Sequence, residues 1–448
     1  MSNLLAARWQ MAISLIFHII FAVIGVALPL LMVIAEALWI RTKDPVYRIL
    51  AQRWARGAAI LFAVGAVSGT VLSFELGLLW PRFMEFAGGI IGPAFALEGF
   101  AFFTEAIFLG IFIYGWNKVR PITHWFAGVV VALSGAASAI LVVLANAWMN
   151  TPQGFEIKDG QPINVDPIAS LLTPAALSQT LHMTLAAYAA TGLLVAGIHA
   201  MGLLRDRTNA FHRHALGIAL ALGGVAALLQ PLSGDYSAKV VARTQPIKLA
   251  AMEGQFRSET RAPLRIGGVA YPEQQTTKYA LEIPGLLSWL AYGRFDARVA
   301  GLNEVSVTDQ PDVRIVHPAF QIMVACGSLM MLVVLWGGWI AWRTRRLPDR
   351  RVFLWALVLA SPLGMIAIEA GWIVTEVGRQ PWIIHQVMRT SEAVTPLKGI
   401  WISLIGVTVL YFALGVIVAK LLWYQFRASP TVEALKDPAS LESDAHHH

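Results

Sequence analysis

Three glutamates lie inside long apolar runs of this 448-residue chain. Glu98 and Glu105 occur in ALEGFAFFTEAIF, and Glu369 occurs in IAIEAGW. The seven-residue spacing of the first two equals two helical turns, so both face the same side of a helix. Ionisable groups at membrane depth are functional by default, and stacked acids suit a proton relay or a cation path. The alternative is a pair of protonated acids bonded to neighbouring backbone. The small residues after Glu369 would let a flat macrocycle approach a metal bound there.

Two histidines occur in similarly apolar surroundings, His18 in SLIFHIIFAVIG and His182 in SQTLHMTLAAYAATG. Each is either hydrogen-bonded to a facing helix or an axial ligand of haem iron, and both interpretations stay open. A His/Met pair gives six-coordinate iron suited to electron transfer. Met323, in FQIMVACGSLMML, is a potential partner, although a methionine on an apolar helix is equally ordinary core packing.

Other ionisable residues carry weaker signals. Lys248 and Glu253 lie five residues apart in TQPIKLAAMEGQF, a pattern that is typical of a solvated amphipathic turn. Glu36 and Glu75 lie near the ends of apolar runs, where we expect them at the membrane interface. The single Cys326 excludes a disulfide framework and a cysteine metal cluster.

The composition predicts an all-α, polytopic membrane protein. Hydrophobic residues make up 57% of the chain and charged residues 14%. About 20 apolar residues are needed to cross the hydrocarbon core. By that criterion we expect nine transmembrane helices, near residues 9–40, 55–80, 94–117, 125–149, 177–203, 214–233, 319–343, 352–376 and 400–426. The first apolar run is too long for a cleavable signal peptide, so none is expected.

The formal net charge of +7 reflects topology rather than nucleic-acid binding. Lysine and arginine gather in alternate short loops, such as residues 41–56, 118–120, 205–213 and 343–351. The positive-inside rule makes these loops cytoplasmic. The N-terminus and the long segment at 234–318 are then outside, and the C-terminus is inside.

The chain divides into four parts. Residues 1–233 carry six spans, 234–318 form an extracytoplasmic segment, 319–427 carry three spans, and 428–448 form a cytoplasmic tail. The terminal histidines resemble a purification tag. Within the external segment, residues 281–295 predict an amphipathic stretch along the membrane surface, and the loop after residue 150 predicts a short hairpin.

Together these segments resemble subunit I of cytochrome bd-type quinol oxidases across essentially all nine spans. The stretches that carry the resemblance are RWQMAISLIFHIIF, ALEGFAFFTEAIFLG, ASAILVVLANAWMNTPQGFE, QPIKLAAMEGQF, QIMVACG and IEAGW followed by GRQPW. QIMVACG, KLAAMEG and GRQPW are specific to that family, and they occur here in the family's order.

The resemblance implies three haems and a quinol site. It assigns His182 and Met323 as axial ligands of the low-spin haem b558, and His18 and Glu369 as ligands of the high-spin haems b595 and d. Glu98 and Glu105 match acids of the high-spin region and its proton supply, with Ser138 on the same route. Lys248 and Glu253 match quinol-binding residues of the external Q-loop. In GRQPW, Arg379 and Trp382 match the surroundings of haem b558, where Arg379 can neutralise propionates.

The activity that the resemblance implies is electrogenic oxidation of membrane quinol at the outer face, with reduction of O2 to water and no proton pumping. It also implies a bacterial cytoplasmic membrane location, a second membrane subunit and a small single-span subunit. The chain departs from some relatives by its short Q-loop, by Gln321 in place of an arginine, and by Met365 in place of a tryptophan.

Two other functions account for part of the pattern. A di-haem membrane anchor of a dehydrogenase also needs buried histidines, but usually pairs several histidines across fewer spans. An ion-coupled secondary transporter would explain the acids, but predicts inverted repeats and broken helices in matching halves. The sequence shows few intramembrane histidines and no such repeat.

Overall fold

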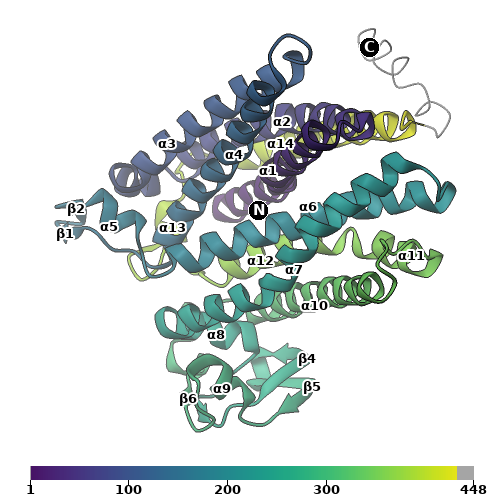
Figure 1. Cartoon of the computed structure of the whole chain (residues 1–448). Helices are drawn as coiled ribbons and strands as arrows, with labels where there is room; N and C mark the ends of the chain where they lie inside the picture. The colour runs from purple at the N-terminus through teal and green to yellow at the C-terminus, as the bar shows by residue number, and fades with distance from the viewer. Residues whose placement is uncertain (1, 431–448) are drawn as a thin grey trace.

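The computed structural model describes residues 2–430 and has the expected helical architecture (Figure 1). Within that range, nine helical spans are long and apolar enough to cross a membrane, which confirms the predicted number. They are α1 (Asn3–Thr42), α2 (Pro45–Leu79), α3 (Pro81–Tyr114), α4 (Pro121–Asn150), α6 (Ala176–Arg205), α7 (Ala210–Thr244), α10 (Val313–Thr344), the pair α11 (Arg351–Ala360) and α12 (Leu363–Val377), and α14 (Ile400–Arg427).

Local sequence signals set where several helices begin. The side chain of Asp44 accepts a hydrogen bond from the Val46 amide at the start of α2, and Asn209 and Asp312 cap α7 and α10 in the same way. Proline opens α2, α3 and α4, where its missing N–H costs nothing. These capping residues and prolines fix the residue at which each of these helices begins.

Helices that follow each other in the chain pack together in several places, and α1 lies at the centre. α1 contacts α2, α4, α6 and α14, α3 packs on α4, and α6 packs on α7. The α6–α7 contact is close because Gly192 and Gly223 face each other. Small residues at such crossings let two backbones approach, which is how helices associate without a hydrophobic driving force.

The eighth span is broken. α11 ends at Ala360 and α12 begins at Leu363, with Ser361 and Pro362 between them. Proline cannot donate the backbone hydrogen bond that a continuous helix needs. The break also lies at a tight contact, because a Cβ on Gly197 of α6 would be 2.4 Å from Cβ of Ser361. The segment after the break carries Glu369.

The segment between the sixth and seventh spans is shorter than the sequence suggested. α7 continues past residue 233 to Thr244, and α10 begins at Val313 rather than 319, so helices extend beyond the apolar runs. Between them lie α8 (Pro246–Glu253), β3 (Glu259–Thr260), β4 (Leu264–Tyr271), η1 (Pro272–Gln274), β5 (Thr276–Ile283), α9 (Leu286–Tyr292), β6 (Arg298–Val299), η2 (Leu302–Glu304) and η3 (Val307–Asp309). Figure 1 shows α8, α9, β4 and β5 gathered on one flank beside α10, which contacts both α8 and β4.

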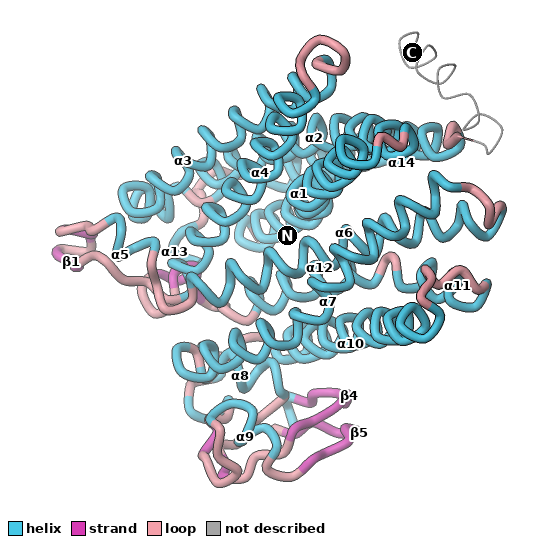
Figure 2. Tube along the Cα trace, viewed as in Figure 1, coloured by secondary structure: helices cyan, strands magenta, loops and turns pink. Residues whose placement is uncertain are grey.

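Strands occur only in the connecting segments of the described chain (Figure 2). The predicted external hairpin is confirmed as β1 (Glu156–Lys158) paired with β2 (Gln161–Ile163), followed by α5 (Pro167–Leu171). The prediction of one amphipathic stretch at 281–295 was wrong. Those residues form the end of β5 and the short α9, separated by Gly285 with φ of 73°. A second small hairpin, β7 (Trp382–Ile384) with β8 (Met388–Arg389), precedes α13 (Thr390–Ala393).

Adding one methyl group at the α6–α7 crossing should weaken the fold. A Cβ at Gly192 would lie 2.4 Å from Cα of Gly223, so Gly192→Ala must push the helices apart. We expect a loss of about 1–3 kcal/mol, because overpacked sites force backbone shifts. Thermal unfolding of the purified complex measures this loss of stability.

The control is Gly217→Ala on α7, where no described heavy atom outside the neighbouring backbone lies within 4 Å of the new Cβ. Equal unfolding temperatures for both variants would contradict this account of the crossing.

Candidate functional site

His18 is held by one ring nitrogen and leaves the other available. Its Nδ1 lies 2.9 Å from Oγ of Ser68 on α2. The Ser68 hydroxyl donates to the backbone oxygen of Val64 at 2.9 Å, so its oxygen accepts from the imidazole. Nδ1 therefore carries the proton, and Nε2 keeps a lone pair. Gly69 makes this approach feasible, because its added Cβ would lie 3.0 Å from the His18 ring.

His182 on α6 shows the same device. Its Nδ1 lies 3.0 Å from Oγ of Ser233 on α7, and that hydroxyl donates to the backbone oxygen of Gln230 at 2.9 Å. The Gln230 side-chain amide nitrogen also lies 3.2 Å from both ring nitrogens of His182, and it can only donate. A bond at Nδ1 that fixes the tautomer and frees Nε2 is the usual setting of a metal-ligating histidine. For His18 the bond to the facing helix and the ligand role are thus compatible, and at His182 a metal on Nε2 would replace the Gln230 contact.

Met323 faces α12, the helix that carries Glu369. The sulfur of Met323 on α10 faces α12, since a Cβ on Gly371 would lie 3.1 Å from it. Within the described chain, neither carboxyl oxygen of Glu369 has a hydrogen-bond partner, although both are shielded from solvent. Ile368, beside Glu369, packs in one cluster with Ile19, beside His18. The helices that carry His18 and Glu369 therefore meet at this level of the bundle.

Glu98 and Glu105 both face α4, in agreement with the prediction that they share one face of a helix. Ser138 donates a hydrogen bond of 2.8 Å to Oε1 of Glu98. A Cβ on Gly135 would lie 3.2 Å from the carboxyl group of Glu105, which is only 7% exposed. The two acids and Ser138 thus lie along one seam between α3 and α4.

Lys248 and Glu253 are buried, so the solvated-turn interpretation was wrong for these two side chains. Each is 5% exposed. The Lys248 ammonium donates to Oδ1 of Asn150 at 2.9 Å and to the backbone oxygen of Thr375 at 3.1 Å, between the end of α4 and the end of α12. Burial lowers the pKa of Lys248 to about 7, with the nearby positive charge of Arg379 acting in the same direction.

Glu253, the last residue of α8, is the second buried ionisable group of this short helix. Burial raises the pKa of its carboxyl group to about 7, and in the part of the chain that the structure describes its Oε2 has no hydrogen-bond partner. Groups that titrate near neutral pH transfer protons efficiently, because neither protonation state is strongly preferred. Lys248 and Glu253 therefore suit a substrate that loses protons at this place.

Arg379 lies in the same region and is 3% exposed. Its Nη2 bonds to Glu376 at 2.5 Å, and Glu376 also accepts from Asn146. Its Nε and Nη1 have no hydrogen-bond partner among residues 2–430. Two buried donors on one guanidinium suit an anionic ligand. Trp382 follows in β7, where the Arg389 guanidinium lies 4.7 Å from its ring.

Several polar residues near these sites were not identified from the sequence. The partners Ser68, Ser233 and Asn150 look like ordinary helix residues, and their roles emerge only when helices pack. Glu36 and Glu75, expected at the interface, are buried, at 0% and 3% exposure. Gln321 accepts from the Gly267 amide at 3.0 Å and donates to the Arg265 carbonyl at 2.9 Å, so it ties β4 to α10.

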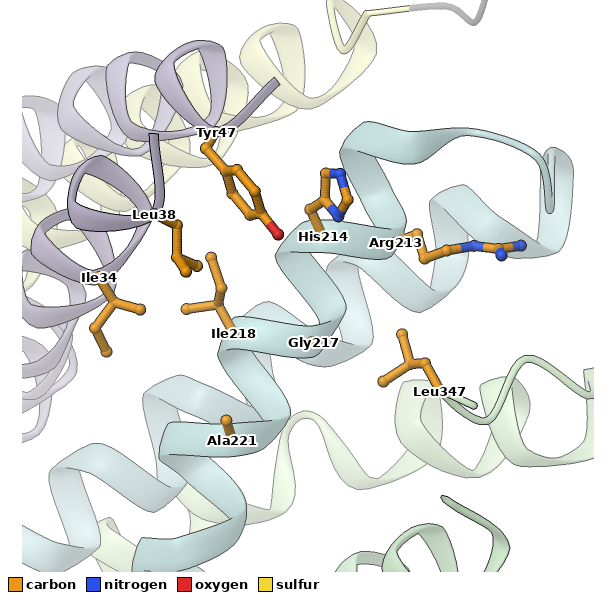
Figure 3. A pocket seen from close by; sticks show the side chains of 9 residues that line it. All are labelled: Ile34, Leu38, Tyr47, Arg213, His214, Gly217, Ile218, Ala221 and Leu347. Carbon is orange, nitrogen blue, oxygen red and sulfur yellow. The ribbon is translucent and has the colours of Figure 1, made fainter. Parts of the chain in front are cut away.

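A groove of about 390 Å³ lies elsewhere, between α1, the start of α2, the first turns of α7 and the 345–350 loop (Figure 3). Ile34, Leu38 and Ile218 form its apolar wall, and Tyr47, His214 and Arg213 lie at its rim. None of the predicted site residues, all of which the structure describes, lines this groove. The candidate chemistry thus lies inside the helical bundle and at the end where α8 lies.

Comparisons with known proteins agree with this arrangement. A family model described as cytochrome bd terminal oxidase subunit I matches residues 6–430. The chain is 38% identical over 447 residues to a putative cytochrome bd menaquinol oxidase subunit I of Bacillus subtilis (strain 168), covering 98% of this chain and 100% of the relative. It is 29% identical over 506 residues to cytochrome bd-II ubiquinol oxidase subunit 1 of Escherichia coli (strain K12), covering 96% and 98%.

A solved structure is similarly close. The bd oxidase from Geobacillus thermodenitrificans matches with a TM-score of 0.89 and 39% identity, over 96% of this chain and 99% of that chain. The fold and these matches define a membrane-bound respiratory oxidoreductase. The chain belongs to the family of subunit I of cytochrome bd terminal oxidases. It is a multi-pass subunit of a bacterial quinol oxidase that reduces O2, and a subunit I implies a second subunit.

The family implies haem cofactors, and the residues present fit them. Within residues 2–430, no group of three or more His, Cys, Asp or Glu side chains is placed to hold an ion. Haem iron needs only one or two protein ligands. The lone pairs on His18 and His182, the thioether of Met323 and the unpartnered carboxylate of Glu369 meet that need, and the free donors of Arg379 suit a propionate.

Proposed function

We propose that this subunit oxidises quinol at the outer face, beside α8, and reduces O2 to water inside the bundle. The observation that carries the proposal is that Lys248 and Glu253 are both buried on the short helix α8, with Lys248 beside Arg379, whose guanidinium has two donors without a partner among residues 2–430. Lys248 binds an oxygen of the head group, and Glu253 accepts its hydroxyl proton. Because Arg379 lies near Lys248, electrons leaving the head group enter the bundle where a propionate would be bound.

The proposed haem ligands fall into two sets. His182 and Met323 would hold the low-spin haem b558, while His18 and Glu369 would hold the two high-spin haems b595 and d. When bound, the haems would supply electron transfer and oxygen activation. Ser68 and Ser233 position the two imidazoles. Met365 packs in the cluster shared by Ile19 and Ile368, between the helices of the high-spin ligands.

Protons for water formation reach the site along the α3–α4 seam. Glu105 and Glu98 pass them inward, and Ser138 orients Glu98 through its 2.8 Å hydrogen bond. Quinol protons leave outside, while those consumed come from the cytoplasm. Charge moved in this way is worth about 2.3 kcal/mol per elementary charge per 100 mV, so energy is conserved without a pump. The proposed assembly includes subunit II and a small single-span subunit.

Removing the acid of the quinol site should change the pH profile. Glu253 accepts a proton only when ionised, so quinol oxidation should fall as the pH drops below its pKa of about 7. We expect Glu253→Gln to lower the rate by about 100-fold and to abolish this acid limb, because general bases contribute on that order. Oxygen consumption with quinol, measured against pH, tests both expectations.

Two controls make the result specific. Glu273→Gln changes an exposed acid of the same loop and should keep the wild-type profile. Reduced tetramethyl-p-phenylenediamine donates electrons without a hydroxyl proton, and its oxidation should survive in Glu253→Gln. Equal loss with both donors, or loss of haem absorbance, would contradict the quinol-site assignment.

Replacing the thioether ligand should change a spin state. Met323→Leu keeps the volume of the side chain but removes the sulfur, so the low-spin haem should become high-spin. The absorption spectrum of the reduced protein reports this change. Met330→Leu, on the same helix two turns later and buried, is the matched control and should leave the spectrum unchanged. An unaltered low-spin spectrum in Met323→Leu would remove Met323 from the ligand set.

A further inference from the structure

A second pair of buried ionisable groups lies at the other end of the bundle, and the mechanism above does not use it. Glu36 is near the end of α1, and His124 is in the first turn of α4. Glu36 is fully buried and His124 is 2% exposed. Oε1 of Glu36 lies 2.7 Å from Nδ1 of His124. A short, dry carboxyl–imidazole pair is an expensive feature unless it has a task.

The second ring nitrogen fixes how many protons the pair holds. Nε2 of His124 lies 2.8 Å from the backbone oxygen of Phe112. A carbonyl oxygen only accepts, so Nε2 must carry a hydrogen. The 2.7 Å bond then contains a single proton, on either Nδ1 or the carboxyl group. Oε2 of Glu36 has no hydrogen-bond partner among the described residues, so a second proton can be added there.

The pair lies one aromatic layer beneath a cation-bearing loop. The Trp116 ring is 4.0 Å from the His124 ring. The Arg48 guanidinium of α2 lies 5.5 Å from the Trp116 ring and 2.6 Å from Oδ1 of Asn117, which is exposed. Arg48 also acts electrostatically on Glu36. Lys118 and Arg120 follow in the same loop, which the positive-inside rule makes cytoplasmic.

The face of α4 that begins at His124 leads to the acids of the oxygen-reducing site. Gly128 lies against Phe112, since its added Cβ would be 2.6 Å from that ring. Gly135 lies against Glu105, and Ser138 bonds to Glu98. Steps of three or four residues keep these positions on one side of a helix. His124 and Gly135 are about 16 Å apart along the axis, at 1.5 Å per residue.

We infer that the Glu36–His124 pair is the loading point at which protons from the cytoplasmic side enter the route to Glu105 and Glu98. The inference rests on the proposed function and names the part of the route that the sequence did not suggest. A proton arriving from the loop joins Glu36, and the shared proton moves on along the α3–α4 seam. The pair gains and loses one proton in each passage, and no electrons move through it.

The test compares two buried acids. Glu36→Gln keeps a hydrogen-bonding group beside His124 but cannot bind the extra proton. Glu75→Gln changes another buried acid, near the C-terminal end of α2, where Gln10 and Ser14 donate hydrogen bonds to its Oε1. Reduced enzyme is mixed rapidly with O2, and a pH-indicator dye follows proton uptake during one turnover. We expect Glu36→Gln to slow uptake at least about tenfold, as loss of a proton-transfer group should, and Glu75→Gln to match wild type.

Two further readouts separate proton loading from a structural role. The rate at which quinol reduces the haems should be unchanged in Glu36→Gln, because that step uses the other face. Infrared difference spectra recorded during proton uptake should show a carboxylic-acid band that shifts in D2O, and this band should be missing in Glu36→Gln. If Glu36→Gln does not assemble, His124→Gln replaces it, with the same expected slowing.

Wild-type uptake rates in the assembled Glu36→Gln and His124→Gln proteins would overturn the inference. Equal slowing in Glu75→Gln would do so as well, since it would attribute the effect to burial in general. If wild-type protein reduced O2 but drew no protons from the cytoplasmic side, both the proton route of the proposed function and this loading point would fall. Normal uptake in every variant would contradict the loading point alone.

Discussion

The structure depends on how it tolerates ionisable groups inside an apolar bundle. A buried polar atom without a partner is costly, and in a membrane water cannot supply one. Most such groups here are matched by a neighbouring helix: each imidazole has its serine, Glu98 has Ser138, and Glu36 has His124. A few are not. Within residues 2–430 these include both oxygens of Glu369, two nitrogens of Arg379 and one oxygen each of Glu253, Glu36 and Glu75. At Glu369, Arg379 and Glu253, cofactors and quinol complete the hydrogen bonding in the proposed mechanism.

Helix α1 connects these places. It contacts the spans α2, α4, α6, α7, α12 and α14, and it carries His18 near mid-span. At one end its Gln10 and Ser14 hold Glu75 of α2, and near the other end its Glu36 holds His124 of α4. A rigid central helix with polar anchors at three levels fixes the relative heights of the ligand and proton-route residues. Gly69 lets α2 approach His18 closely, next to the Ser68 anchor.

Much of this was predictable, because spans and motifs are local. The nine spans, the shared face of Glu98 and Glu105, and the family followed from apolar run length, helical period and the GRQPW, KLAAMEG and QIMVACG motifs. Span ends were less predictable, because α7 continues through the polar residues 234–244 as a helix beyond its apolar run. The burial of Lys248, Glu253 and Glu36 was not predicted, because the helices that cover these side chains are distant from them in the sequence. The serine partners had no sequence signal at all, and the predicted tail beyond residue 430 lies outside the described residues.

The central claim is that iron porphyrins make these buried imidazole and carboxyl groups tolerable. The most direct test is the reduced-minus-oxidised absorption spectrum of the purified oxidase, with iron measured on the same sample. The account predicts stoichiometric iron, the bands of b-type haem, and a chlorin band in the far red. Fully folded protein that is colourless and free of iron would contradict it.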